Sequence, residues 1–438
     1  MRVLGIDVGT SSIKAAVIDV QRAEIVGAIS HVPYRLENPT PEAAEVPANR
    51  LWAAIRAAAS AVTGTIRGVE AVGLSCLAPS LILLDSADRP LTSIWTHLDR
   101  RARAVARRIW LEVGEEFLAT IGNRPLPGGI SAVCWQKQVE DDPDLLQKTK
   151  SYLHANGWLG LHLTGERAFD RANASFSGLY GTMTDQAWSE RWCSYFRVDR
   201  KWLPPVASGD TTIGALRSEI ANELGVPAGV PVKLGTADTS SAMLLAGMQP
   251  GDLLHVVGTT QVVAALVQNP VPSAARLTRQ LGVGEQFIQV THNPVGGAAL
   301  EWIRQLCFRE QTPAEFYTDT IARALSHPTL VSLDPPYLGG DRLEIEPEQA
   351  GFRGLGLTTD RIDLLAAVLL AMRQRHYEAL GALGMGQQFM RIFLTGGGSE
   401  VVQRLIPEYR QGAVRPLEEG SLRGVARLFQ REDPSPQS

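Results

Sequence analysis

Residues 1–19, MRVLGIDVGTSSIKAAVID, hold the pattern on which the fold assignment rests. The aliphatic and β-branched residues of 2–8 and 13–20 predict two strands joined as a β-hairpin. The joining turn reads Gly-Thr-Ser-Ser (9–12) and follows Asp7 closely. Chain reversal requires only a Gly or an Asn. An acid followed by three hydroxyl groups therefore indicates a function beyond the turn itself.

A near-copy of this segment occurs in the second half of the chain. VGTSSIKAAVI (8–18) aligns without a gap on VGTTQVVAALV (257–267), with Val, Gly, Thr and two consecutive alanines in common. Two ordinary hairpins are the alternative explanation, but both turns are rich in hydroxyl groups and they lie one domain length apart. The repeat predicts a duplicated α/β domain with a boundary near residue 245.

The two Gly-hydroxyl turns predict phosphate binding. Backbone N–H groups in a glycine turn, helped by Ser and Thr hydroxyls, donate to phosphate oxygens without a bulky side chain intervening. Asp7 is a candidate ligand of Mg²⁺, the hard cation that phosphoryl transfer requires. A turn-capping acid is the alternative for Asp7, although an unpaired charge within an apolar strand is costly.

A third glycine stretch, FLTGGGSE (393–400), follows a short apolar run and precedes a helical pattern with Ser399 as its expected N-cap. Three glycines let the chain pass closely under a flat ligand or approach phosphates. A triple glycine alone is usually a flexible loop. Together with the two turns it predicts a third side of a nucleotide site.

GTADTSSA (235–242) places Asp238 at the end of an apolar strand, among small residues that leave room for a substrate. A carboxylate in this position can accept the proton of a hydroxyl group. The alternative is that Asp238 is the N-cap of the following helix. The residues alone leave these two interpretations open.

The totals limit the classes of protein. The 438 residues are 45% hydrophobic and 20% charged, which predicts a globular protein too long for one ordinary core and therefore two domains. A net charge of -4 provides no basic field for nucleic acid or an anionic membrane. The four cysteines form no CxxC pair, and no signal peptide or apolar span is evident, so a cytoplasmic protein with reduced thiols is expected.

Four motifs, in this order, resemble the FGGY carbohydrate kinases of the actin and hexokinase superfamily. They are GIDVGTSSIKAAVID (5–19), GTADTSSA (235–242), VVGTT (256–260) and LTGGGSE (394–400). Further segments resemble xylulokinase-like members, so that the resemblance spans nearly the whole chain. They are PLTSIWTHLDRRA (90–102), LTGERAFDRANAS (163–175), PPYLGGDR (335–342), AGFRGLGLTTDRIDLLAAVL (350–369) and EEGSLRGVARL (418–428).

The resemblance implies an α/β protein with two actin-like (ribonuclease H-like) domains flanking a central cleft. Residues 1–245 would hold the sugar, the first phosphate loop and the catalytic base, and residues 246–438 would hold the second phosphate loop and the adenosine motif. It implies an ATP-dependent carbohydrate kinase that uses Mg²⁺ and a small-molecule sugar. A monomer or homodimer is expected, without nucleic-acid or membrane partners.

By position, the resemblance also implies site residues. Asp238 matches the catalytic base, which contacts the sugar, and Asp7 matches the Mg²⁺-linked acid. The cofactor-binding positions are Thr10, Ser11, Ser12 and Lys14 in the first phosphate loop, Gly258, Thr259 and Thr260 in the second, and Gly396, Gly397 and Gly398 in the adenosine motif.

The sugar-binding segments depart from the family pattern. Xylulokinases carry Gln-Met-His-Gly, and glycerol kinases an Arg-Glu pair, where residues 75–80 read SCLAPS; the family's Trp-Asn-Asp-Arg reads HLDR at 97–100. Ser80, His97 and Asp99 are the candidate sugar contacts, with a structural hydrogen bond as the alternative for His97. By analogy, the predicted acceptor is a ketopentose such as ribulose or xylulose.

Other assignments stay open at this point. The acceptor could instead be another polyol, a hexose or a sugar acid. A catalytically weak nucleotide-binding regulator on the same fold would lack the base or a phosphate turn, yet Asp7, Asp238 and both Gly-Thr turns are present. An actin-like or chaperone-like ATPase generally lacks segments similar to 163–175 and 335–342.

Overall fold

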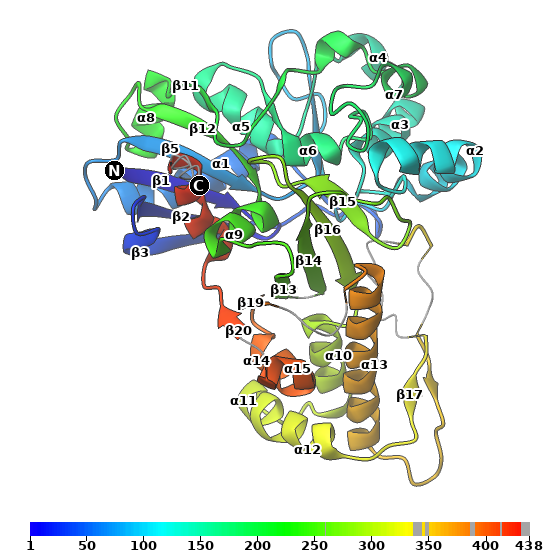
Figure 1. Ribbon diagram of the computed structural model, residues 1–438. Coiled ribbons are helices and arrows are strands. Elements are labelled where there is room, and N and C mark those ends of the chain that lie inside the picture. The colour runs from blue at the N-terminus through cyan, green and yellow to red at the C-terminus, as the bar shows by residue number, and fades with distance from the viewer. Residues whose placement is uncertain (259, 336–343, 347–349, 386–389, 412–413, 431–438) are drawn as a thin grey trace, which may run out of the picture. The chain divides into compact units, whose positions relative to one another are not determined.

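The computed structural model of the protein describes residues 1–258, 260–335, 344–346, 350–385, 390–411 and 414–430 (Figure 1). It divides into two compact units. The first unit contains Met1–Met248, Arg279–Phe287 and Glu419–Ser438, and the second contains Gln249–Thr278 and Ile288–Glu418. After residue 248 the chain therefore re-enters the first unit twice.

The first unit is organised around a six-stranded sheet with the strand order β11-β12-β5-β1-β2-β3. In that order the strands are β11 (Thr212–Ala215), β12 (Pro231–Ala237), β5 (Ala71–Cys76), β1 (Arg2–Val8), β2 (Ser12–Asp19) and β3 (Glu24–Pro33). The predicted hairpin is β1 and β2, with Val8 opposite Ile13. Because β1, β5 and β12 pair in parallel, their C-terminal ends lie at one edge of the sheet.

The hairpin strands are buried on both faces. Val3, Leu4, Ile6 and Val8 are fully buried. Helix α1 (Ala48–Thr63) packs on β1, β2 and β3, and α16 (Gly420–Gly424) with the 3-10 helix η3 (Val425–Phe429) packs on β1 and β5. Cover on both faces explains why these strands are continuous apolar runs rather than alternating patterns.

Helix α9 (Asp238–Ala246) packs closely against α16, and the two lie side by side in Figure 1. A Cβ atom on Gly424 would lie 2.0 Å from the carbonyl oxygen of Ser241, so the two helices meet backbone to backbone. The C-terminal segment thereby supports the helix that begins with Asp238.

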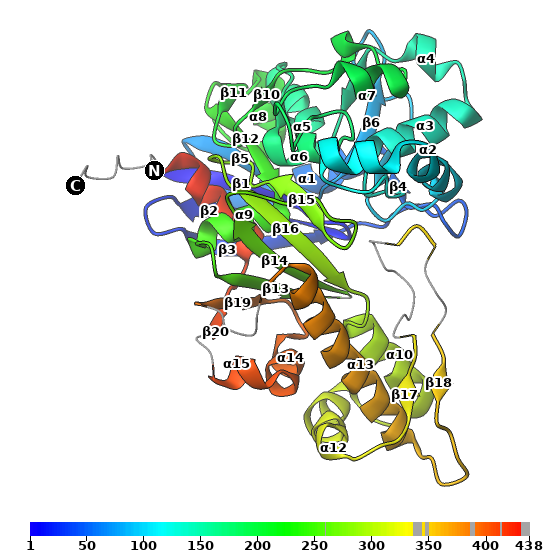
Figure 2. The same ribbon diagram turned by 45° about the vertical axis from the view of Figure 1, so that its right-hand side comes forward.

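Most of the remaining elements of the first unit lie above and to the right of this sheet in Figure 2. The strands are β4 (Glu45–Val46), β7 (Ile94–Thr96), β6 (Ser80–Leu84) and β8 (Ser151–Leu153), which form a four-stranded sheet in that order, and the pair β9 (Phe169–Asp170) and β10 (Val206–Ala207). The helices are α2 (Arg103–Ile121), α3 (Ser131–Asp141), α4 (Leu145–Lys148), α5 (Ala155–Thr164), α6 (Arg171–Ser175), α7 (Glu190–Tyr195), η1 (Arg200–Trp202) and α8 (Ser218–Leu224).

A second six-stranded sheet has the order β15-β16-β14-β13-β19-β20, and most of it belongs to the second unit; Arg279 and Gln280 of β15 and Phe287 of β16 belong to the first. In that order the strands are β15 (Leu277–Gln280), β16 (Phe287–Asn293), β14 (Gln261–Val267), β13 (Leu253–Val257), β19 (Ile392–Thr395) and β20 (Val414–Pro416), and a separate pair is β17 (Ser332–Leu333) and β18 (Phe352–Arg353). The helices are α10 (Gly297–Cys307), α11 (Pro313–Glu315), the π-helix η2 (Phe316–Thr320), α12 (Ile321–Ser326), α13 (Arg361–Ala382), α14 (Ser399–Leu405) and α15 (Pro407–Gln411).

The second sheet repeats the central order of the first. In each, an antiparallel hairpin is followed by two further strands that pair in parallel: β13 and β14, then β19 and β20. This confirms the duplicated α/β fold that the two Val-Gly-Thr segments predict. The boundary near residue 245 and the functions assigned to each half stay predictions.

Two expectations from composition can be compared with the described residues. Among them, no helix combines the length and the hydropathy that a membrane span requires. The four cysteines are free thiols, of which Cys76, Cys134 and Cys193 are buried.

Candidate active site

The turn between β1 and β2 is held by its backbone rather than by its hydroxyl groups. The N–H of Gly9 donates to the carbonyl oxygen of Ser12 at 3.0 Å. The hydroxyl of Tyr34 donates to the Gly9 carbonyl at 2.5 Å, and its N–H donates to the Ser11 carbonyl at 3.0 Å. Ser11 is exposed, while Thr10 and Ser12 are half-buried. The carbonyl groups are therefore occupied while the turn keeps its hydroxyls near the surface of the unit.

Asp7 is almost fully buried near the C-terminal end of β1, with an exposed fraction of 7%. The hydroxyl of Ser75, directly opposite on β5, donates to Oδ1 at 2.8 Å, and the hydroxyl of Ser421 donates to Oδ2 at 2.6 Å. Burial raises the pKa of Asp7 to about 6; the Ser421 hydrogen bond opposes this shift, and the charge of Asp238 adds to it.

The carboxylate of Asp7 fits a hydrated cation. Each of its oxygens carries one hydroxyl donor, and an ionised carboxylate offers about four acceptor positions. The remaining positions can accept hydrogen bonds from metal-bound water, the ligand that Mg²⁺ usually retains.

Lys14 lies opposite Asp7 in the hairpin but pairs elsewhere. Its ammonium group forms an ion pair with Glu419, at 2.7 Å between Nζ and Oε2. Contact of Lys14 with a nucleotide phosphate stays a prediction. The phosphate would have to bind the ammonium group beside Glu419 or displace that carboxylate.

Asp238 is the first residue of α9, directly after β12, and is half-buried. Its Oδ1 accepts hydrogen bonds from the N–H of Thr239 at 2.5 Å and from the Thr239 hydroxyl at 3.0 Å. The N-cap residue is Ala237, and no side chain caps this helix. The alternative that Asp238 is the N-cap is therefore wrong.

The two acids lie at the same edge of the first sheet. Asp7 is near the end of β1 and Asp238 follows the end of β12, with β5 between these parallel strands. Cys76, the last residue of β5, has a pKa raised by burial and by the charges of Asp7, Asp170 and Asp238. Crevices outside the carboxyl ends of parallel strands are the usual ligand sites of such sheets.

Asp170 fixes the end of β12, the strand that directly precedes Asp238. Its Oδ1 accepts from the N–H groups of Ala172 and Asn173 and so caps α6, and it also accepts from the hydroxyl of Thr236 at 3.0 Å. Thr236 lies two residues before Asp238, so this buried contact ties the end of β12 to α6.

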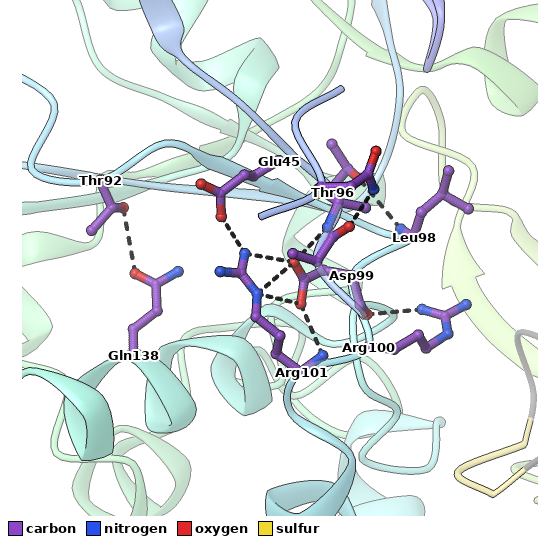
Figure 3. Close-up of polar contacts among 11 residues, drawn as sticks. Glu45, Thr92, Thr96, Leu98, Asp99, Arg100, Arg101 and Gln138 are labelled. Carbon is purple, nitrogen blue, oxygen red and sulfur yellow. Dashed lines mark hydrogen bonds and ion pairs between the residues drawn. The ribbon is translucent and has the colours of Figure 1, made fainter. Parts of the chain in front are cut away.

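Two of the candidate sugar contacts, Ser80 and Asp99, already form side-chain hydrogen bonds within the first unit. The Ser80 hydroxyl oxygen accepts from the N–H of Ala155 at 3.0 Å. Asp99 is 1% exposed, and its Oδ2 accepts from Arg101 at 2.7 Å and from the N–H of Ala44 at 2.9 Å (Figure 3). The His97 carbonyl accepts from Arg100 at 2.8 Å. Sugar contacts of these residues stay predictions.

The second Gly-Thr turn lies between β13 and β14. The N–H of Gly258 donates to the carbonyl oxygen of Thr260 at 3.0 Å, and Thr259 lies outside the described residues. Val257 is opposite Gln261, whereas Val8 is opposite Ile13 in the first unit. The second turn is therefore one residue shorter, although the two segments align without a gap.

The triple glycine packs directly on this second turn. The N–H of Gly398 donates to the carbonyl oxygen of Val257 at 3.1 Å, and a Cβ on Gly396 would lie 2.3 Å from that oxygen. The N-cap of α14 is Gly398, so the expected N-cap at Ser399 is wrong. The Ser399 hydroxyl instead donates to the carbonyl of Gly396 at 2.6 Å, because Ser399 already has helical geometry.

A further glycine pair completes this part of the second unit. The N–H of Gly297 donates to the carbonyl oxygen of Gly258 at 2.9 Å, which places the start of α10 beside the turn. Gln261 donates to the carbonyl of Val295 at 2.6 Å, just before that helix. Sequence reasoning missed Gly296 and Gly297; the signal was a Gly pair before the amphipathic run 298–307.

The buried charge of Asp7 gives a stability prediction. Because its pKa in the folded protein is about 6 against an ordinary 3.8, folding takes up a proton between these pH values, and the stability contribution falls as pH rises through this window. We expect Asp7→Asn to be more stable than the parent by about 1 to 3 kcal/mol at pH 8 without Mg²⁺ or ATP.

Urea unfolding of both proteins at pH 5 and pH 8 measures this difference, which should be smaller at pH 5. A variant that is less stable than the parent at pH 8 would show that Ser75 and Ser421 outweigh the cost of burying the charge.

Three comparisons with known proteins agree. The profile of the N-terminal domain of the FGGY family of carbohydrate kinases matches residues 2–245. The chain is 29% identical over 384 residues to L-xylulose/3-keto-L-gulonate kinase of Escherichia coli K12, covering 83% of this chain and 74% of that relative.

Solved structures share the fold. Ligand-bound xylulose kinase from Lactobacillus acidophilus has a TM-score of 0.88 at 21% identity, covering 99% of this chain and 90% of its own. Gluconate kinase from the same organism has a TM-score of 0.88 at 20% identity, covering 98% and 89%. Together with the repeated sheet order, these matches show the two-domain actin-like sugar-kinase fold that the sequence predicts.

Proposed function

This chain belongs to the FGGY family of carbohydrate kinases and is an ATP-dependent sugar kinase, and we propose that Asp238 is the general base of the reaction. The observation that carries the proposal is that Asp238 and Asp7 lie at the same C-terminal edge of one sheet. They are close enough for the charge of Asp238 to raise the pKa of Asp7. Asp238 does not cap α9, and among the described residues only its Oδ1 accepts hydrogen bonds, so Oδ2 is available for chemistry.

The proposed step uses one oxygen of Asp238. Oδ1 is held by Thr239, which leaves Oδ2 to accept the proton of the acceptor hydroxyl. The oxygen of the acceptor hydroxyl, as it loses its proton to Asp238, forms a bond to the γ-phosphorus. At the same time the bond from the γ-phosphorus to the bridging oxygen breaks, and ADP leaves with the electron pair. When bound, ATP would supply the phosphoryl group, and Mg²⁺ would neutralise negative charge on the phosphate oxygens.

The other roles are assigned around this step. Asp7, oriented by Ser75 and Ser421, would accept hydrogen bonds from water on Mg²⁺. The N–H and hydroxyl groups of 9–12 and 258–260 would donate to phosphate oxygens, and 396–398 would lie against the adenosine. The cytoplasmic location and the monomer or homodimer expected from the sequence also stay predictions.

The acceptor is proposed to be a keto sugar. The sequence predicts a ketopentose such as ribulose or xylulose. The name of the E. coli relative supports a ketopentose and adds a keto sugar acid, 3-keto-L-gulonate.

Coupled ADP release across a panel of ketoses, aldoses, polyols and sugar acids tests the function. We expect at least one keto sugar to raise ADP release about 100-fold or more above the rate with water as acceptor, and excess EDTA to abolish the gain. If every acceptor leaves ADP release at the water rate, a nucleotide-binding regulator explains the chain better.

A further inference from the structure

Arg279 is a buried cation beside the proposed catalytic base. It lies on β15 in the part of the chain that re-enters the first unit, and its exposed fraction is 2%. Its Nη1 donates to the hydroxyl of Ser240, two residues after Asp238, and to the carbonyl of Gln280 at 3.5 Å. Its guanidinium carbon lies 5.6 Å from the centre of the Phe176 ring.

The position of Arg279 is on the β12 side of the first sheet. The N–H of Gln280 donates to the hydroxyl of Ser175 at 3.1 Å, which joins β15 to α6, and these elements are neighbours in Figures 1 and 2. Helix α6 is in turn joined to β12 through Asp170 and Thr236. Asp7 and the 9–12 turn are two strands away on β1.

The guanidinium of Arg279 forms no ion pair with any of the described residues. Among them, no carboxylate lies within the 4.0 Å that defines an ion pair with its guanidinium. The nearby Asp170 is occupied by Thr236 and by the first turn of α6, and Oδ1 of Asp238 by Thr239. Burial lowers the pKa of Arg279 to about 10, while the charges of Asp238 and Asp170 oppose the shift, so the side chain stays charged at neutral pH.

An unpaired buried charge is costly, and buried charges are normally paired. Both hydrogen bonds of the Arg279 guanidinium to described residues come from Nη1. The Nε and Nη2 atoms remain, and such an adjacent pair of donors suits a carboxylate bound through both of its oxygens.

We propose that Arg279 binds the carboxylate of the acceptor, so that the preferred acceptor of this kinase is a sugar acid. The inference rests on the proposed function, because Asp238 defines where the acceptor lies. The phosphoryl group in transfer is a second source of anionic oxygens. Its proposed site is at the 9–12 turn and Asp7, whereas Arg279 is on the β12 and α6 side, which favours the acceptor.

Two acceptors test this directly, because 3-keto-L-gulonate and L-xylulose differ by one carboxylate group. We expect the parent to have a kcat/KM at least 10-fold higher for the acid. Arg279→Met should lower kcat/KM for the acid by about 10- to 150-fold, the range for losing a charge-assisted hydrogen bond. It should change the value for L-xylulose by less than about 3-fold, and Arg279→Lys should keep part of the preference.

Arg171→Met is the matched control. Arg171 also contacts the 279–287 segment, through a hydrogen bond of 2.9 Å to the Gly284 carbonyl, but it is only half-buried. We expect this variant to keep the acid preference of the parent.

The outcomes separate the two proposals. Equal losses for both acceptors in Arg279→Met, or a parent that phosphorylates neutral ketoses and ignores acids, would overturn the role of Arg279 and leave the kinase function standing. No turnover of any acceptor would overturn the function itself. If Arg279→Met does not fold, calorimetric titration of the Asp238→Asn protein decides: tighter binding of 3-keto-L-gulonate than of L-xylulose supports the inference, and equal binding refutes it.

Discussion

Replacing Asp238 with Asn is expected to lower kcat with the best acceptor by about 10²- to 10⁴-fold, the contribution of a positioned general base. Asn has the same shape and keeps an oxygen that can accept from Thr239, so the geometry at the start of α9 is retained. It cannot take the proton of the acceptor hydroxyl. KM for ATP should change by less than about 3-fold, because the proposed phosphate contacts lie in other segments.

Ser241→Ala serves as the control for this prediction. Ser241 lies on the same helix, is fully buried, and its hydroxyl has no hydrogen-bond partner among the described residues. We expect the control to keep the kcat of the parent. An Asp238→Asn protein that retains more than about a tenth of the parent kcat in the coupled assay would remove Asp238 from the role of base.

The fold could be predicted from the sequence because its deciding signals are local. The hairpin of β1 and β2 follows from two apolar runs around a Gly-hydroxyl turn, and the second hairpin follows from the same pattern at 257–267. The gapless match of 8–18 with 257–267 does not predict the register in which β13 pairs with β14. The second turn is one residue shorter, since Val257 pairs with Gln261, and pairing depends on backbone geometry that a gapless match does not contain.

The contacts that orient the two acids depend on residues far apart in the chain. Ser75 and Ser421 donate to Asp7 from positions 68 and 414 residues away. The sequence marks 75–80 only as an apolar departure from the family pattern, and no local pattern pairs Ser421 with Asp7. Arg279 was missed for the same reason, because its partner Ser240 is 39 residues away.

Asp99 lies in a motif that the sequence identifies, but its carboxylate is bound by residues that the motif did not predict. Its carboxylate binds Arg101 and the N–H of Ala44, and the Arg101 guanidinium lies 3.6 Å from the centre of the Trp95 ring. The motif identifies the residue type but not its neighbours. The contact with Ala44 joins two segments 55 residues apart, and only the folded chain brings them together.

Gly396→Ala is expected to destabilise the protein and to weaken ATP binding strongly. Gly396 has a φ of +99°, which residues with a side chain rarely adopt, and an added Cβ would lie 2.3 Å from the Val257 carbonyl oxygen. That oxygen also accepts the hydrogen bond from Gly398, so relief of the clash would move the triple glycine away from the second turn. We expect a loss of about 2 to 4 kcal/mol in the free energy of unfolding.

Gly397→Ala separates support of the fold from contact with the nucleotide. Apart from its two chain neighbours, no described residue has an atom within 4 Å of a Cβ placed on Gly397, so the unfolding free energy of this variant should stay within about 0.5 kcal/mol of the parent value. If residues 396–398 lie against the adenosine, the added methyl group occupies ligand space, and KM for ATP should rise about 10-fold or more while KM for the sugar is unchanged. In Gly396→Ala, both the free energy of unfolding in urea and KM for ATP should therefore change. In Gly397→Ala, only KM for ATP should change. An unchanged KM for ATP in Gly397→Ala would mean that the triple glycine serves the packing of β19 on β13 and not the nucleotide.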